Sequence, residues 1–303
     1  MNTHSHPVDL ARDPAACRAA IIEALGEGNL SLFLGAGVSL SSGRFLGWSS
    51  LVKACCENVG VSFDDTQAED NEYLLLAGDR FKKKCLHEGG DFRERIEDCL
   101  YQNRQSYDKT FMKLDLLIAI GALVMNSVRG RANCVVNYNY DDVLEWYLMY
   151  HGFLVSIVAQ YPELLGKHDI AIYHPHGFLP LMAAFRRHRS APEQVVISKD
   201  DYQEAISESS PWNDFQKGQF GSTVALFVGM SGDDEHIQVL FRHAYKKLVK
   251  YKRVIGFMLL EDTPKSHKRE EENRDRGIIH VYYPNHDALP DYLLEICRDA
   301  VVR

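Results

Sequence analysis

Short apolar segments that alternate with stretches of helical spacing limit what this chain can fold into more than any other feature. Runs such as LSLFL, CVVNY, VALFV and IIHVYY are rich in β-branched and aromatic residues, and most are followed by apolar residues three and four positions apart. Strands that are apolar along their whole length are buried on both faces, which is typical of parallel sheets. The sequence therefore predicts an α/β fold: a Rossmann-like, mainly parallel sheet with helices on both faces.

The order of the expected elements follows from the same patterns. A helix over residues 15–25 is expected to end at Gly26 and Gly28, just before the first strand. Further strands are expected within residues 133–140, 154–160, 171–177, 194–198, 223–231, 251–260 and 277–284, with helices near 141–150, 200–206, 233–249 and 287–302. The polar segment 263–277 is expected to be a charged helix or loop.

The domain organisation expected from these patterns is a single domain, 1–303, with a helical insertion over residues 48–131. Segments 48–59, 71–86, 92–102 and 111–128 have apolar spacings nearer 3.6 than 2. Length alone would allow one large domain or two smaller ones. The strand and helix alternation that resumes after residue 131 favours one domain.

Composition and charge exclude several classes of protein. A net charge of −8 disfavours a broad phosphate-gripping surface, and the basic run that ends at Arg253 has the spacing of a solvated helix face. We expect no strong nucleic-acid binding, no membrane span and, from the polar first residues, no secretory signal, so a cytoplasmic location is expected. The seven cysteines contain no C-x-x-C pair, which predicts reduced thiols and no zinc knuckle.

The first candidate site is the glycine turn Gly35-Ala36-Gly37, followed by Ser39, directly after a strand. Such a turn lets backbone N–H groups approach a phosphate. The G-x-G-x-x-G pattern of dehydrogenases is absent, because position 40 is leucine, and Glu57 lies in a helical pattern where a strand-end acid would be needed. The sequence therefore gives little support for hydride transfer. A purely structural turn would also be consistent with these residues.

Polar residues follow two more strands. Asn139 and Asp141 come after CVVNY, and His174 and His176 close the segment AIYHPHG. A histidine with a near-neutral pKa can take a proton from a hydroxyl or a water. The alternatives are an N-cap at Asp141 or Asp142, a turn at Asn139, a structural histidine and a two-histidine metal site.

The last candidate site is GMSGDDEHI after the strand VALFV. Gly229 and Ser231 can present backbone N–H and hydroxyl donors to a phosphate, and an acidic residue can cap the next helix. Ordinary loop chemistry would also account for this stretch.

Taken in order, these motifs resemble the SIR2 (sirtuin-related) family. GAGVS is similar to its phosphate loop, Asn139-Tyr140-Asp141 to its N-x-D element, and His176-Gly177 to its catalytic HG, while GMSGDDEHI resembles the G-x-S-x-x-D-x-x-I pattern of bacterial members. Deacylating members also carry two C-x-x-C pairs and a GIPDFR stretch, whereas this chain has neither and reads GRFLGW from Gly43. The resemblance is therefore to the NAD⁺-hydrolysing effectors of bacterial anti-phage defence.

This resemblance implies a Rossmann-like NAD⁺ hydrolase without zinc that releases nicotinamide and ADP-ribose. It implies Asn139, His176 and Asp141 as catalytic residues. It implies NAD⁺ binding by Gly35, Ala36, Gly37, Ser39, Asn139, Gly229 and Ser231. It also implies homo-oligomers and an ATPase or helicase (HerA-like) or an Argonaute-type partner. Because a constantly active NAD⁺ hydrolase would exhaust its own cell's NAD⁺, we expect a latent effector that is activated in a complex. The alternatives are a non-catalytic sensor of NAD⁺ or ADP-ribose and an ADP-ribosyl transferase or cyclase.

Overall fold

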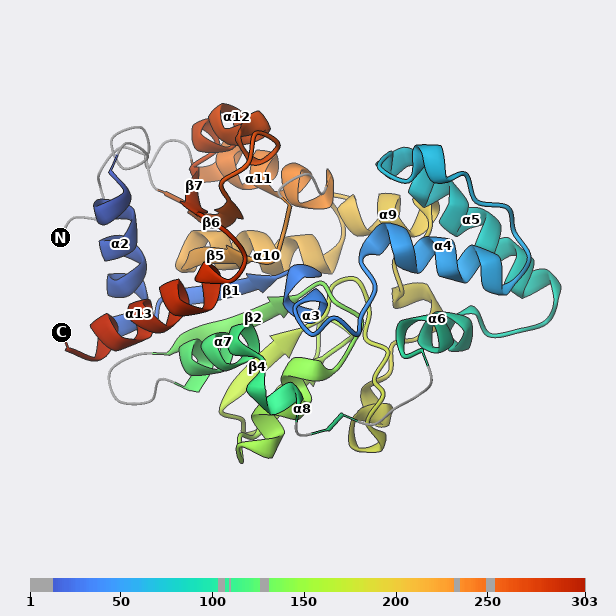
Figure 1. Cartoon of the computed structure of the whole chain (residues 1–303), viewed down its shortest axis with the longest axis horizontal. Coiled ribbons are helices and arrows are strands. Elements are labelled where there is room, and N and C mark those ends of the chain that lie inside the picture. Colours follow the sequence, from blue (N-terminus) through green and yellow to red (C-terminus); the bar gives the residue numbers. More distant parts are fainter. Residues whose placement is uncertain are drawn as a thin grey trace.

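A parallel sheet of seven strands organises the part of the chain that the computed structural model describes, which is residues 13–102, 107–108, 110–125, 131–231, 235–248 and 254–302. The strand order is β3-β4-β2-β1-β5-β6-β7, and each neighbouring pair is parallel. The strands are β1 Leu30–Leu34, β2 Ala132–Asn137, β3 Val155–Val158, β4 Ile170–Tyr173, β5 Val224–Val228, β6 Gly256–Glu261 and β7 Ile278–Tyr283. The Rossmann-like α/β prediction is confirmed (Figure 1).

The topology places a reversal of winding at the centre of the sheet. The chain runs from β1 to its neighbour β2 on one side, and from β5 to β6 on the other side. Because β1 and β5 are neighbours, the direction of winding reverses between them. Open parallel sheets bind ligands at such a reversal, beyond the carboxyl ends of the strands.

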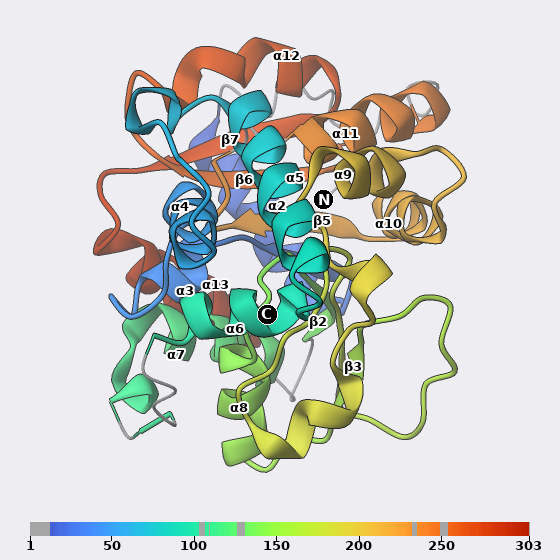
Figure 2. The same cartoon turned by 90° about the vertical axis from the view of Figure 1, so that its right-hand side faces the viewer.

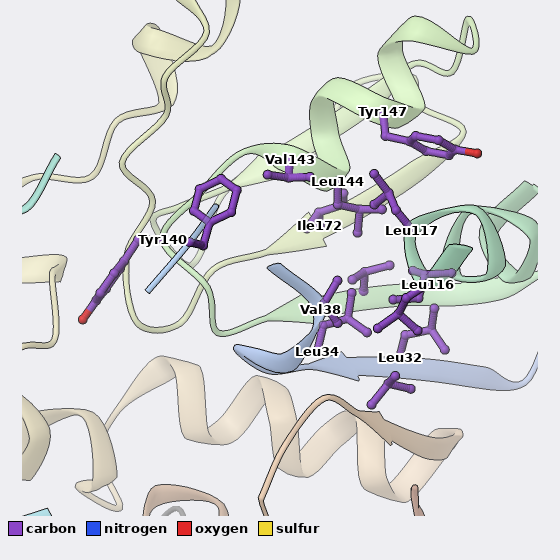
Figure 3. Close-up of a cluster of buried hydrophobic side chains, with 14 of the residues drawn as sticks. Leu32, Leu34, Val38, Leu116, Leu117, Tyr140, Val143, Leu144, Tyr147 and Ile172 are labelled. Carbon is purple, nitrogen blue, oxygen red and sulfur yellow. The ribbon is translucent and has the colours of Figure 1, made fainter. Parts of the chain in front are cut away.

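Helices cover both faces of the sheet. Leu30, Leu32 and Leu34 of β1 enter one apolar core with α2 (Pro14–Gly26), α7 (Asp115–Met125), α8 (Val143–Tyr150) and α13 (Ala288–Val302). Phe33 points into the other core, with α10 (Pro211–Ser222) and α11 (Glu235–Leu248). Figure 3 shows part of the first core, where Leu32 and Leu34 lie opposite Leu116 and Leu117. Continuous burial of β1 is therefore explained by a core on each side.

A group of helices lies beyond the carboxyl ends of the strands (Figures 1 and 2). It contains α4 (Trp48–Asn58), α5 (Asn71–His87) and α6 (Phe92–Leu100), which pack on one another, and α9 (Lys199–Ile206), which packs on α5. The helical pattern of residues 48–125 is confirmed, although α7 packs against α8 and α13 rather than joining this group. The insertion over residues 48–131 stays a prediction, and residues 126–130 lie outside the described part.

Shorter elements complete the described chain. They are α3 Gly37–Leu40, α12 Glu270–Asp275 and the 3-10 helices Asp65–Gln67, Phe111–Lys113, Ala183–His188, Pro192–Gln194 and Ser266–Arg269. The polar segment 263–277 thus contains a charged helix, as expected. Within the described residues, no helix is both long and apolar enough to cross a bilayer.

The strand predicted over residues 194–198 is wrong. Val195, Val196 and Ile197 are buried, but they form an irregular segment that leads into α9. The backbone N–H groups of Ile197 and Ser198 donate to the Asp201 carboxylate at 3.3 and 3.1 Å, which caps the helix instead of extending a sheet. A short buried apolar run cannot be told from a strand by its periodicity alone.

Candidate active site

Four neighbouring strands end at the same edge of the sheet and carry the motifs found in the sequence. In the order β4-β2-β1-β5, these strands lead into His176, Asn139, Gly35 and Gly229. The sequence alone gave the order of the motifs along the chain but not their adjacency. The sheet order therefore brings all of them to the edge where the winding reverses.

The glycine turn packs directly on the loop after β5. The Gly37 N–H donates to the Gly229 carbonyl at 2.9 Å, and a Cβ atom at Gly35 would lie 2.6 Å from that same oxygen. A Cβ atom at Gly37 would lie 2.8 Å from the Gly229 Cα, and Gly229 itself has a φ of +70°. Only residues without a side chain fit this contact. Ala36 lies half-buried between the two glycines of the turn.

Asn139 links the segment after β2 to the glycine turn. Its side-chain Nδ2 donates to the Gly35 carbonyl at 3.0 Å, and its backbone N–H donates to the Asn137 Oδ1 at 3.2 Å. The side chain is half-buried. Since the Nδ2 group faces Gly35, the Oδ1 atom is directed elsewhere and remains an acceptor.

Asp141 is almost fully buried and is bonded to Ser39. The Ser39 hydroxyl donates to the Asp141 Oδ2 at 2.7 Å, and the Val143 N–H donates to the Oδ1 at 3.2 Å. Burial raises the pKa of the Asp141 carboxyl to about 7, and the charges of Glu145 and Asp142 add to the rise while the two hydrogen bonds oppose it. This carboxyl therefore changes charge near neutral pH.

Asp142 joins distant segments rather than capping α8. Its carboxylate accepts hydrogen bonds from the Tyr107 hydroxyl at 2.6 Å and from the Met182 N–H at 2.8 Å. It makes no side-chain cap bond, although it occupies the N-cap position of α8. Burial raises its pKa, and the hydrogen bond from Tyr107 is the largest opposing effect. Of the adjacent acids, Asp141 is thus the one that faces the Gly35–Ser39 segment.

The two histidines of the HPH segment have different surroundings. His174 is fully buried, with its Nε2 atom 2.9 Å from the Glu145 Oε1 atom and its Nδ1 atom 3.2 Å from the Asn139 carbonyl oxygen. His176 is half-buried, and its Nε2 atom lies 2.8 Å from the Nδ1 atom of His236. Within the described residues, no group of three His, Cys, Asp or Glu side chains is arranged to hold a metal. His174 is therefore structural. His176 is the histidine that keeps part of its side chain exposed.

The loop after β5 is only partly described. Gly229 contacts the glycine turn, and Ser231 is exposed. Residues 232–234 of the GMSGDDEHI stretch, including the predicted acidic helix cap, lie outside the described residues. The predicted phosphate donors at Gly229 and Ser231 and the predicted NAD⁺ contact of Ser39, whose hydroxyl is bonded to Asp141 here, stay predictions.

Sequence reasoning missed the side chains around the candidate histidine, two of which form a hydrogen-bonded chain behind it. His236, which is fully buried, lies within the GMSGDDEHI stretch, where the motif itself assigns it no role. Asn213 accepts from the other nitrogen of His236 at 3.0 Å, and it comes from α10, a helix that the sequence did not predict. The histidine could have been found from its motif, whereas the asparagine had no signal.

Comparison with known families agrees with this architecture. Residues 133–281 match the family model of the SIR2-like domain. That match covers β2 to β7 except for the first residue of β2 and the last two residues of β7, and the remaining strand, β1, lies at the centre of the same sheet. Residues 133–281 are therefore similar to a SIR2-like domain.

Two curated proteins are similar to this chain over most of its length. The chain is 25% identical over 227 residues to the NAD(+) hydrolase ThsA of Bacillus cereus (strain MSX-D12), a match that covers 73% of this chain and 41% of the relative. It is 22% identical over 240 residues to the NAD(+) hydrolase ThsA of Cytobacillus dafuensis, which covers 77% of this chain and 41% of the relative. The matches thus span about two fifths of the length of these relatives.

Proposed function

We propose that this chain binds NAD⁺ and hydrolyses its nicotinamide–ribose bond, giving nicotinamide and ADP-ribose. The observation that carries the proposal is the hydrogen bond from Asn139 to the Gly35 carbonyl, which joins the N-x-D element to the glycine turn where the sheet reverses its winding. His176 follows the adjacent strand β4 and so lies at the same edge of the sheet. The names of the two curated relatives support the same reaction.

The reaction needs polar groups near the ribose more than it needs an acid. Nicotinamide leaves as a neutral molecule, so the barrier lies in the positive charge that develops on the ribose. Asn139 orients the ribose or the attacking water, and His176 accepts the proton of that water. Asp141 stabilises the developing charge or holds the ribose. Its raised pKa makes this contribution larger above neutral pH, where the carboxyl is ionised.

The glycine turn is the proposed pyrophosphate site. Gly35, Ala36 and Gly37 lie directly after β1, the position at which a glycine turn can approach a phosphate. Ser39 completes this group, and Gly229 and Ser231 are proposed to lie near the adenosine half. In this proposal NAD⁺ is the substrate rather than a resident cofactor.

Loss of either polar group tests the assignment. We expect His176→Ala and Asn139→Ala each to lower nicotinamide release at least about 10²-fold, which is the usual effect of removing a positioned catalytic group. His151→Ala is the matched control, because His151 is exposed at the end of α8 that points away from this edge. Turnover that stays unchanged in both site variants refutes the assignment.

The products distinguish the proposed reaction from its alternatives. Chromatography of NAD⁺ incubations detects ADP-ribose for hydrolysis and a cyclised or transferred ADP-ribose unit for the transferase or cyclase alternative. Binding of NAD⁺ without nicotinamide release, even with the natural partner present, identifies a sensing module instead.

The biological role that we propose is that of a latent effector in bacterial anti-phage defence. An enzyme that is always active would exhaust the NAD⁺ of its own cell, so activation by homo-oligomers or by an ATPase, helicase or Argonaute-type partner is proposed. Nicotinamide release should then rise when products of neighbouring genes are added. High activity of the chain alone at every concentration contradicts latency.

A further inference from the structure

A chain of hydrogen bonds behind His176 starts at Asn213 in α10. The Asn213 Nδ2 donates to the Ser207 carbonyl at 2.6 Å, and its Oδ1 lies 3.0 Å from the His236 Nε2. A backbone carbonyl can only accept, so the amide nitrogen must face Ser207 and the amide oxygen must face His236. Both Asn213 and His236 are 0% exposed. The orientation of the amide is therefore fixed by its partners.

The orientation of Asn213 determines where His236 carries its proton. Because the Asn213 Oδ1 accepts, the His236 Nε2 must be the protonated nitrogen. A charged imidazolium is costly at a fully buried position, which favours a neutral His236 with an unprotonated Nδ1. The His176 Nε2, 2.8 Å away, must then be the donor to this atom.

Neighbouring side chains hold the two rings in place. The Gln216 Nε2, one helical turn after Asn213, donates to the Trp212 carbonyl at 3.1 Å, and the Gln216 Oε1 accepts from the Tyr138 hydroxyl. The Tyr138 ring meets the His176 ring edge-on, with 4.8 Å between the centroids. The Tyr202 hydroxyl accepts from the His236 backbone N–H at 2.6 Å. Among the described residues, the titratable groups in contact with the two histidine rings thus include Tyr138, just after β2, and Tyr202 in α9.

We propose that His236 and Asn213 are positioning residues that hold His176 as the tautomer protonated on Nε2, which makes Nδ1 the nitrogen that accepts a proton. This inference rests on the proposed function for its chemical consequence. An imidazole whose second nitrogen is bonded to a fixed partner keeps one tautomer and one ring orientation. His176 is then ready to act as a base without first exchanging its proton.

The step that follows conserves atoms and charge. The ribose–nicotinamide bond breaks, and both of its electrons go to the ring nitrogen, which becomes neutral. The water oxygen forms the new bond to the ribose carbon and gives its proton to the His176 Nδ1. The resulting imidazolium donates from Nε2 to His236 and later releases one proton to solvent, so the products are nicotinamide, ADP-ribose and a proton.

Nitrogen NMR of histidine-labelled protein tests the tautomer without any turnover. In the unchanged protein the His176 signals, assigned by their loss in His176→Ala, should show a protonated Nε2 and an unprotonated Nδ1. His236→Phe and Asn213→Leu should each give a mixture of tautomers at His176. Gly218→Ala is the matched control, since Gly218 is exposed in α10 and a Cβ atom there meets nothing. A protonated Nδ1 in the unchanged protein, or an unaltered tautomer in both variants, overturns the proposal.

The pH dependence of nicotinamide release gives a second, independent readout. Asn213→Asp places a carboxylate beside the His236 Nε2, which favours the doubly protonated ring and turns its Nδ1 into a donor. We expect the acidic limb of kcat/KM to move up by about one pH unit or more, with KM within about twofold. An acidic limb of the kcat/KM profile that remains at the same pH in Asn213→Asp contradicts the inference. If the unchanged protein releases no nicotinamide, the proposed function fails, and the NMR result still decides the tautomer.

Discussion

At the scale of single residues, the site is defined by which polar groups are buried and which remain within reach of a ligand. His174 and Glu145 are both fully buried and bonded to each other, while His176, two positions further on, is half-buried. Asp142 accepts hydrogen bonds from Tyr107 and Met182, in two separate segments, while Asp141 faces Ser39. Neighbours in the sequence thus have different surroundings and different hydrogen-bond partners.

Asp141 should make the stability of the protein depend on pH. Its pKa is about 7 in the folded chain and near 3.8 when exposed, so the unfolded state loses this proton first. Its contribution to stability is therefore complete below about pH 4 and is lost as the pH rises toward 7. The free energy of unfolding, measured with urea from pH 4.5 to 8, should fall more steeply in the unchanged protein than in Asp141→Asn. Parallel curves for the two proteins contradict the raised pKa.

At the scale of secondary-structure elements, close packing joins the outer helices to the sheet. Gly78 in α5 lies against the irregular segment before α9, and a Cβ atom there would be 1.9 Å from the Ile197 carbonyl oxygen. The segment in turn contacts the HG loop, because the Val196 N–H donates to the His176 carbonyl at 3.0 Å. The position of α5 is therefore linked to the backbone of the candidate base.

Gly78→Ala should destabilise the protein by about 1–3 kcal/mol, as expected when a methyl group enters a filled space. Alanine is otherwise the better helix former, so Gly218→Ala in α10, where the space is open, should increase stability by about 0.5–1 kcal/mol. Urea unfolding at one pH measures both changes. Equal effects of the two substitutions would show that α5 is not closely packed on this segment.

The elements that sequence patterns predicted were those with apolar periodicity. β1, β2, β5 and β7 appear as continuous apolar runs because both of their faces are buried. α10 was missed because PWNDFQKGQFGS contains proline, glycine and short polar residues, and part of its buried face consists of Asn213 and Gln216. Segment 194–198 was assigned wrongly because burial, not sheet pairing, explains its apolar residues. The glycine turn, Asn139 and His176 were found from their motifs, whereas the partners of His176 depend on tertiary contacts.

At the scale of the whole molecule, the site is assembled from distant parts of one sheet. Gly35, Asn139, His176 and Gly229 follow strands that are neighbours in space but are separated by long stretches of sequence. The Gly37–Gly229 hydrogen bond closes the contact between the loops after β1 and β5. A ligand that touches these loops together should therefore stabilise the entire sheet rather than one element.

NAD⁺ should raise the unfolding temperature of His176→Ala, which we expect to bind NAD⁺ without consuming it. Ligand at 100 times its dissociation constant adds about 2.7 kcal/mol to the stability of the folded state. Adding Gly37→Val to this variant should remove the shift, because its side chain would collide with Gly229. Calorimetry with and without NAD⁺ measures the effect, and an equal shift in both proteins would place the ligand elsewhere.

The short connection between α9 and α10 has a consequence for control of the proposed activity. Residues 208 and 209 in this connection are exposed, and the preceding Ser207 carbonyl fixes the Asn213 amide. If a bound partner displaced this connection, the amide could rotate and present its nitrogen to His236. The reversed amide dipole would then prevent the candidate base from accepting a proton. This effect would act at some distance from the substrate, and no loop would block access to the site.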